Sequence, residues 1–105
     1  MFTVMFVLYK REGMDQAEAL RYWREPHGPL AAAVPGVRSY MQLQATAAPE
    51  GEPPFLGVAT LEFDDEAAFQ AGAASTEMAT AVQDLANFSV PDRLPTAFVE
   101  SVKVA

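Results

Sequence analysis

The N-terminal segment Phe2–Tyr9 constrains the fold of this chain more than any other feature. It is rich in aromatic and β-branched residues, and apolar residues occupy both of its alternating positions. This pattern is typical of a β-strand that is buried on both faces. The run is far shorter than the roughly 20 apolar residues of a transmembrane helix, and it lacks the basic flank and cleavage site of a signal peptide. We therefore predict a strand that is buried on both faces, and no membrane partner.

The rest of the chain alternates between helical and strand patterns. The predicted strands are Val37–Thr46, Gly57–Phe63 and Thr96–Val104, and the predicted helices are Gln16–Glu25, a segment that begins at Ala67, and Thr76–Phe88. The resulting order of strand, helix, strand, strand, helix, strand is the split βαβ pattern of the ferredoxin-like fold. The predicted fold class is α+β (βαββαβ), with a four-stranded antiparallel sheet in a single domain that spans residues 1–105.

Local signals mark the ends of these elements. Asp15 and Ser75 precede helical patterns and are expected to act as N-caps. Pro26 is expected to disturb the first helix, and His27-Gly28-Pro29 to form a turn after it. The segment Ala47–Pro54 holds three prolines and a glycine, which predicts an irregular hairpin loop.

The helices of this fold cover only one face of the sheet. We place Tyr40 and Gln42 of the second strand on the opposite, uncovered face, together with Thr60 of the third. A second copy of the same sheet is an economical cover for a face that mixes apolar and polar residues. The sequence therefore predicts a homodimer.

The composition excludes several classes of function. The net charge is −7, and no basic stripe is present, so a nucleic acid is not an expected partner. The chain has no cysteine and one histidine, which leaves no thiolate or two-histidine metal site. We expect no metal and no cofactor, although the residue count does not exclude haem with His27 as an axial ligand. The lack of cysteine suits a cytoplasmic location.

Several motifs stand out along the chain: Tyr9-Lys-Arg-Glu-Gly-Met14, Tyr22-Trp23, His27-Gly28-Pro29-Leu30, and Pro35-Gly36-Val37 with Tyr40. Together they resemble the EthD family, and Asp84, Asn87-Phe88 and Glu100 also fall where that family often has similar residues. The resemblance runs over nearly the whole chain and implies a dimeric α+β barrel, in which two sheets close around an apolar cavity. Members of the wider superfamily include cofactor-free oxygenases, lactone isomerases, polyketide cyclases and haem-dependent enzymes. Fold membership therefore narrows the function only to a set of candidates.

The candidate catalytic residues are His27 and Tyr22. A histidine has an unperturbed pKa near neutrality, which suits a general acid or base. The alternative is that His27 ties the end of the first helix to the following turn through hydrogen bonds. Tyr22 and Trp23 are adjacent on one helix and face directions about 100° apart, so one can pack on the sheet while the other approaches a pocket. Trp23 shares its face with Leu20, which favours the core.

The candidate ligand-binding residues are a few polar and aromatic side chains among apolar ones, as in most small-molecule cavities. They are Tyr9, Trp23, Arg38, Tyr40, Gln42, Thr60 and Glu62. For Arg38 and Glu62, the alternative is a cross-strand ion pair at the rim of the barrel. Glu100 is open in the same way, because a carboxylate in an apolar barrel would have a raised pKa and could move protons.

Three functions remain open. The first is a cofactor-free isomerase, cyclase or monooxygenase (an oxidoreductase) that binds, in the barrel, a small apolar or aromatic metabolite of catabolic or polyketide metabolism. The second is a non-catalytic metabolite-binding or oxygenase-accessory protein, and the third is a dimer with a filled barrel and no ligand. For the first two, we expect an apolar pocket between the sheet and the first helix, with His27 and Tyr22 near its mouth and Tyr40 on its wall.

Overall fold

The computed structural model describes all 105 residues of the chain. Four strands form one antiparallel sheet in the order β2-β3-β1-β4. Their bounds are Phe2–Leu8 (β1), Ser39–Gln44 (β2), Gly57–Phe63 (β3) and Thr96–Val99 (β4). The N-terminal strand is paired on both edges. Within the chain it is not buried on both faces as predicted: Val4 and Leu8 face the helices and are buried, whereas Met5 and Val7 lie on the other face and are only partly buried.

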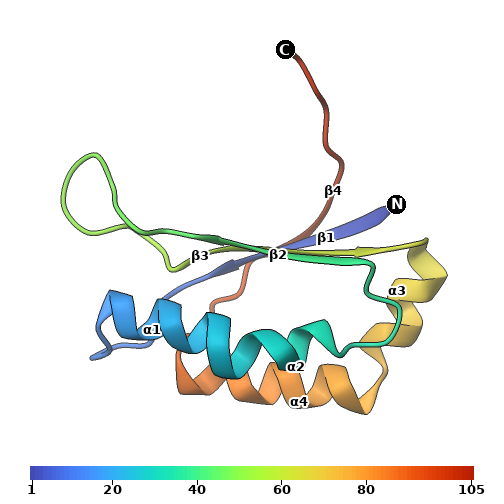
Figure 1. The fold of residues 1–105 in the computed structure, drawn as a ribbon, viewed down its shortest axis with the longest axis horizontal. Coiled ribbons are helices and arrows are strands. Elements are labelled where there is room, and N and C mark those ends of the chain that lie inside the picture. Colours follow the sequence, from blue (N-terminus) through green and yellow to red (C-terminus); the bar gives the residue numbers. More distant parts are fainter.

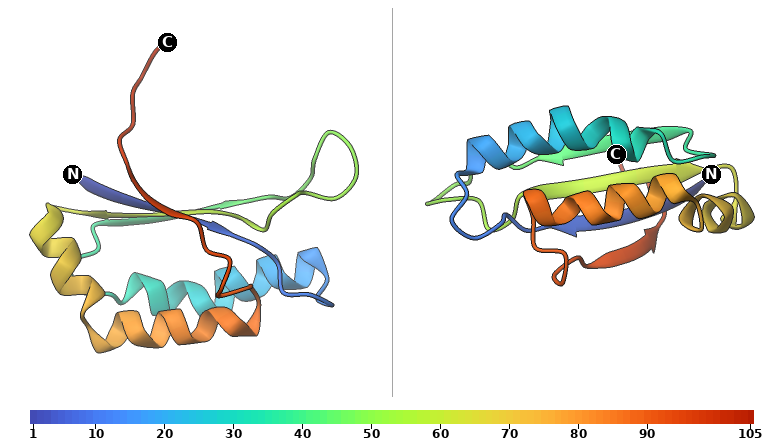
Figure 2. Two further views of the ribbon diagram at one scale, coloured as in Figure 1. Left: turned by 180° about the vertical axis from the view of Figure 1, so that it is seen from behind. Right: turned by 90° about the horizontal axis from the view of Figure 1, so that it is seen from below.

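All the helices lie on one side of this sheet (Figure 1). They are α1 (Gln16–Tyr22), η1 (Trp23–His27), α2 (Gly28–Ala32), α3 (Glu66–Ala73), α4 (Thr76–Asp84) and η2 (Leu85–Asn87). The run from α1 to α2 and the helix α4 lie side by side over one face of the sheet, roughly along the direction of the strands (Figure 2). The ferredoxin-like α+β fold predicted from the sequence is confirmed.

Side-chain caps fix two of the helix starts. The Asp65 carboxylate accepts a hydrogen bond from the Ala68 amide at 2.8 Å at the start of α3, and Ser75 Oγ accepts one from the Met78 amide at 3.1 Å at the start of α4. Ser75 is therefore the N-cap of α4, as predicted from the sequence. Asp15 precedes α1 with an extended backbone, but its side chain makes no capping bond.

The core lies between the sheet and the helices. Cross-strand pairs such as Val4 with Leu61 and Phe6 with Ala59 point toward the helices. The buried side chains form two clusters, one around Trp23 and Phe88 and one around Phe63. Phe6 and Tyr40 are partly buried and pack against both clusters, so they mark the place where the two parts of the core meet.

The prediction for the faces of β2 was wrong. Tyr40 is paired with Leu61 and Gln42 with Ala59, which puts both side chains on the helix side of the sheet. The alternate residues Met41 and Leu43 lie on the other face, where each is 57% exposed. A hydrogen bond accounts for this orientation of β2. Gln42 donates it to the main-chain carbonyl of Trp23 at 2.9 Å, and this carbonyl can be reached only from the side of the sheet where the helices lie. Thr60 is on the uncovered face, as predicted.

Pro26 does not end the first helix, and the predicted turn at His27-Gly28-Pro29 is wrong. The chain passes from α1 through a π-helical segment, Trp23–His27, directly into α2. Proline has no N–H for an ordinary helical hydrogen bond, and a wider π-turn accommodates this defect within the helix. His27 is consequently a helical residue, and it is 5% exposed on the side that faces the sheet.

The opposite face of the sheet has no cover within the chain. It carries Met5, Val7, Met41, Leu43, Val58 and Val99, with Thr3, Thr60 and Glu62 among them. Beyond β4 the chain leaves the sheet on this same side (Figure 1). None of the helices combines the length and the apolar character that crossing a bilayer requires.

Candidate functional site

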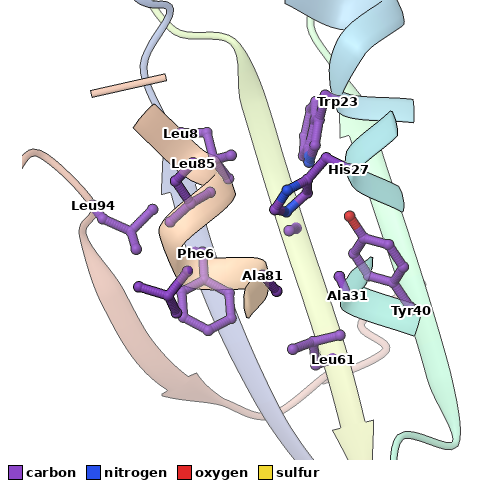
Figure 3. Close-up of a pocket in the computed structure, with 12 residues that line it drawn as sticks. Phe6, Leu8, Trp23, His27, Ala31, Tyr40, Leu61, Ala81, Leu85 and Leu94 are labelled. Carbon is purple, nitrogen blue, oxygen red and sulfur yellow. The ribbon is translucent and has the colours of Figure 1, made fainter. Parts of the chain in front are cut away.

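An apolar pocket lies between the sheet and the helices, where the two parts of the core meet. Its volume is about 60 Å³. Twelve residues line it, from β1, η1, α2, β2, β3, α4, η2 and the connection to β4 (Figure 3): Phe6, Leu8, Trp23, His27, Ala31, Tyr40, Ala59, Leu61, Ala81, Val82, Leu85 and Leu94. No acidic or basic side chain other than His27 is among them, so His27 is the one group on the wall that titrates near neutral pH.

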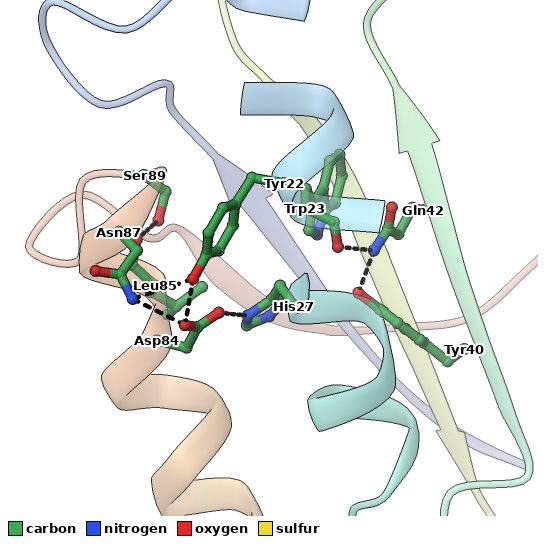
Figure 4. Close-up of polar contacts among 9 residues, drawn as sticks. All are labelled: Tyr22, Trp23, His27, Tyr40, Gln42, Asp84, Leu85, Asn87 and Ser89. Carbon is green, nitrogen blue, oxygen red and sulfur yellow. Dashed lines mark hydrogen bonds and ion pairs between the residues drawn. The ribbon is translucent and has the colours of Figure 1, made fainter. Parts of the chain in front are cut away.

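His27 is held in place by Asp84. The distance between His27 Nδ1 and Asp84 Oδ2 is 2.9 Å, and the two side chains come from the π-helical segment and the end of α4 (Figure 4). Asp84 also accepts hydrogen bonds from the Tyr22 hydroxyl at 2.8 Å and from Asn87 Nδ2 at 2.9 Å. Asp84 is therefore the centre of a network that joins the two helices beside the pocket.

The network favours an ionised Asp84. Partial burial tends to raise the pKa of this carboxyl, but hydrogen bonds from Asn87, His27 and Tyr22 outweigh burial and hold the pKa below its ordinary value. The bond to Asp84 raises the pKa of the Tyr22 hydroxyl. Tyr22 is thus a hydrogen-bond donor to Asp84, at neutral pH, rather than a proton acceptor.

The electrostatics also fix the state of His27. Burial lowers the pKa of the His27 imidazole, and the neighbouring Asp84 offsets only part of this effect. His27 is therefore neutral at pH 7, and its proton lies on Nδ1, where it is donated to the ionised Asp84. The other nitrogen, Nε2, makes no hydrogen bond within the chain. It carries the free lone pair of a general base.

Trp23 and Tyr40 form the other polar part of the wall. Gln42 Nε2 donates hydrogen bonds to the Trp23 carbonyl at 2.9 Å and to the Tyr40 hydroxyl at 2.7 Å (Figure 4). The indole nitrogen of Trp23 is fully buried and has no hydrogen-bond partner. Burial raises the pKa of the Tyr40 hydroxyl, and the hydrogen bond from Gln42 and the nearby Trp23 indole offset only part of this effect, so Tyr40 stays protonated at neutral pH. The indole N–H faces this hydroxyl but does not meet the geometry of a hydrogen bond to it.

The structure brings together some of the residues proposed from the sequence and separates others. His27, Trp23 and Tyr40 line the pocket. Tyr22 does not line it and reaches it only through Asp84. Gln42 lies just behind Tyr40.

The remaining candidates lie elsewhere. The Arg93 guanidinium lies 3.7 Å from the ring centre of Tyr9, outside the pocket. The Arg38 side chain pairs with Asp64 at 2.9 Å and not with the Glu62 side chain, so the ion pair between Arg38 and Glu62 is wrong, although the Arg38 amide donates a hydrogen bond to the Glu62 carbonyl at 2.7 Å. Arg38 is exposed, because it precedes β2 at the sheet edge. Thr60 and Glu62 lie on the uncovered face.

Sequence reasoning did not place Asp84 in the site. Asp84 is three residues after Ala81 and four before Phe88, both of which are buried. This spacing puts its carboxylate on the inward face of the helix, where a charge needs a partner. This spacing was the feature of the sequence that could have placed Asp84 in the site. No three or more His, Cys, Asp or Glu side chains lie together where they could hold a metal ion.

The comparisons with known proteins agree with this architecture. The family model described as the EthD domain matches residues 11–92, which is most of the chain. The chain belongs to the EthD family. The match includes α1 to α4, and with them His27 and Asp84. None of the curated proteins matches this EthD chain in sequence.

Solved structures show the same fold. An ethyl tert-butyl ether D (EthD) family protein from Bacillus halodurans aligns with a TM-score of 0.76 and 22% identity, over 97% of this chain and 100% of that one. A protein from Thermobifida fusca, described as dimeric and ferredoxin-like, aligns with a TM-score of 0.67 and 13% identity, over 93% of this chain and 88% of that one. An antibiotic biosynthesis monooxygenase aligns with a TM-score of 0.62 and 16% identity, over 98% and 100%. At these identities the similarity establishes the fold alone.

Proposed function

We propose that this EthD protein is a homodimeric, cofactor-independent enzyme that binds a small apolar or aromatic metabolite in the pocket and moves a proton with His27 as the general base. The observation that carries the proposal is the 2.9 Å contact between His27 Nδ1 and Asp84 beside an apolar pocket. A base that is neutral at pH 7, oriented by a carboxylate and shielded from water suits proton abstraction from a weakly acidic substrate. Isomerisations and cyclisations of carbonyl compounds that pass through an enolate begin with this step.

The other residues support this chemistry in distinct ways. Asp84 fixes the tautomer of His27 and stabilises the imidazolium that forms when Nε2 takes a proton. Tyr22 and Asn87 hold the carboxylate in place. The apolar wall of Phe6, Leu8 and their neighbours selects an apolar substrate and excludes water. Tyr22 is thus proposed as a positioning residue.

The homodimer belongs to the same proposal. The uncovered sheet face displays Met41 and Leu43, each 57% exposed, beside Met5, Val7 and Val58. Contiguous apolar surface of this kind is typical of a protein interface. A dimer that pairs the two uncovered faces would leave both pockets on the outer, helical side, so that each subunit keeps its own His27 and Asp84.

The test is turnover of a panel of small apolar ketones, lactones and phenols by the purified dimer and by His27→Gln. We expect His27→Gln to lose about 10²–10⁴-fold in kcat while its ligand dissociation constant changes little. The matched control is Ser89→Ala. Ser89 is also buried and does not itself line the pocket; it donates a hydrogen bond of 2.7 Å to the main-chain carbonyl of Leu85. This control loses stability, on the order of 1 kcal/mol, and keeps its turnover.

Two outcomes favour other functions. Equal turnover by wild type and His27→Gln assigns His27 to structure alone. Ligand binding without turnover over the whole panel, and a metabolite retained through purification and detected by mass spectrometry, indicate a metabolite-binding or oxygenase-accessory protein.

A further inference from the structure

We propose that the Trp23 indole N–H and the Tyr40 hydroxyl together bind one oxygen atom of the ligand, and that this ligand is an apolar carbonyl compound which forms an enolate in the pocket. The inference rests on the proposed function, because it places the ligand in the pocket beside His27. It adds the substrate class and two residues that hold the oxygen.

The indole nitrogen of Trp23 is the first observation. It is the one side-chain nitrogen or oxygen atom that is fully buried without a hydrogen-bond partner in this structure. Buried donors of this kind are rare in folded proteins, and such a group calls for an explanation. Trp23 lines the pocket, and its nitrogen lies at the end of the ring that points toward His27 and Tyr40 (Figure 3).

The ring of Trp23 is fixed in this orientation. Its six-membered ring packs against Gly57, so closely that a Cβ at Gly57 would lie 2.7 Å from Cζ3 of Trp23. The main chain of Trp23 is held from the other side by the amide of Gln42. The indole therefore cannot turn away to find a partner elsewhere, and its N–H remains directed at the pocket.

The hydroxyl of Tyr40 is the second donor. Gln44 Nε2 donates to Gln42 Oε1 at 3.0 Å, which fixes the Gln42 amide with its nitrogen toward Tyr40. Gln42 then donates to the Tyr40 oxygen at 2.7 Å, so this oxygen already serves as an acceptor. The hydroxyl proton of Tyr40 has no acceptor in the chain. The polar chain behind the pocket thus leaves Tyr40 able to donate into it.

The surroundings define the chemistry of the oxygen. Two N–H and O–H donors suit a carbonyl oxygen that gains negative charge during the reaction. No Lys or Arg side chain lines the pocket, so a permanently charged carboxylate or phosphate would lack a counter-ion there. A neutral ketone, or a phenol in its keto form, fits the wall and the donors.

The reaction that follows is balanced within the site. His27 Nε2 takes a proton from the carbon next to the carbonyl, the C–H bond breaks, and its electron pair moves through the new C=C bond onto the carbonyl oxygen. The enolate oxygen is then held by the donors of Trp23 and Tyr40. Where a C=C bond of the ligand is conjugated with the enolate, the electron pair returns from oxygen to re-form the C=O bond, the double bond shifts, and its far carbon takes the same proton back from His27. This gives a double-bond isomer without any co-reactant.

Cyclohexanone and methylenecyclohexane provide the test. The two probes have similar shapes, but the second has a CH₂ group in place of the carbonyl oxygen. Because Trp23 is the single tryptophan, one indole N–H signal in an NMR spectrum of ¹⁵N-labelled protein reports on this donor. We expect cyclohexanone to move this signal downfield and methylenecyclohexane to leave it near its original position.

The variants Tyr40→Phe and Trp23→Phe sharpen the test. Each should weaken cyclohexanone binding about fivefold to tenfold, as expected for one lost hydrogen bond, and leave methylenecyclohexane binding unchanged. If Trp23→Phe does not fold, Tyr40→Phe and the wild-type indole signal still decide the matter. The inference is overturned if both probes bind equally and the indole signal does not move. It is also overturned if neither probe binds.

Exchange of the ketone α-protons in D₂O separates this inference from the proposed function. Exchange catalysed by wild type and lost in His27→Gln supports both. A downfield indole shift without catalysed exchange supports the oxygen site but contradicts the role of His27 as a base.

Discussion

Replacement of Asp84 by alanine is the most informative perturbation of the protein, because three side chains from two helices share its carboxylate. Tyr22 and Asn87 are partly or fully exposed, so water can replace Asp84 as their partner. His27 is buried, and its Nδ1–H would lose a charge-assisted bond that contributes roughly 1.5–3 kcal/mol. With a smaller loss from Tyr22 and Asn87, we expect Asp84→Ala to lower the free energy of unfolding by about 2–4 kcal/mol.

Urea unfolding at pH 8 and constant protein concentration measures this loss, and a double-mutant cycle with His27→Gln isolates the pair. We expect a coupling free energy of roughly 1 kcal/mol or more between the two positions. Constant concentration matters because dissociation of a dimer contributes to its apparent stability. A total loss below about 0.5 kcal/mol, the usual range of surface substitutions, would refute the argument that Asp84 is the centre of the network.

Three further outcomes follow from the structure. The free energy of unfolding should decrease as pH falls below about 6.5, because the depressed pKa of His27 lets the unfolded chain bind a proton that the folded chain does not. In His27→Gln the free energy of unfolding, measured between pH 7 and pH 5, should depend less on pH. The same pH dependence in wild type and variant would contradict burial of a neutral imidazole. Phe63→Ala should cost about 3–5 kcal/mol in urea unfolding, because Phe63 has no exposed surface, and a loss under 1 kcal/mol would mean that this cluster is not packed. Met41→Glu should yield a monomer near 11.4 kDa in light scattering, whereas Gln83→Glu on the exposed side of α4 should stay dimeric; a dimeric Met41→Glu would place the interface elsewhere.

The sequence was a good guide to the elements and a poor guide to the faces of one strand. β3 was predicted with its observed bounds, because Ala59, Leu61 and Phe63 alternate with more polar residues. On β2 the alternation places Met41 and Leu43 on one face of the strand and Tyr40 and Gln42 on the other. Both sets contain large side chains, so periodicity shows which residues share a face but not which face meets the helices.

The prediction of a turn directly after Pro26 was wrong for a related reason. A proline removes one hydrogen bond, and local rules then favour a helix end. The π-turn at Trp23–His27 persists because its neighbours pack on both sides: Trp23 is fully buried against Gly57, and Gln42 bonds to its carbonyl. These contacts come from strands distant in sequence, and no local pattern reveals them.

By itself the sequence determined the fold class, the presence of strand β1, the one-sided helical layer and His27 as the single group that titrates near neutrality, because each follows from local periodicity, element order or composition. Only the tertiary structure decided that His27 is buried on a helix, that Asp84 lies against it across 57 residues of sequence, and that the Trp23 indole is directed at the pocket without a partner. These features depend on which distant side chains meet in the core. Contacts between distant side chains are determined by the packing of the whole chain and not by the pattern of any one segment.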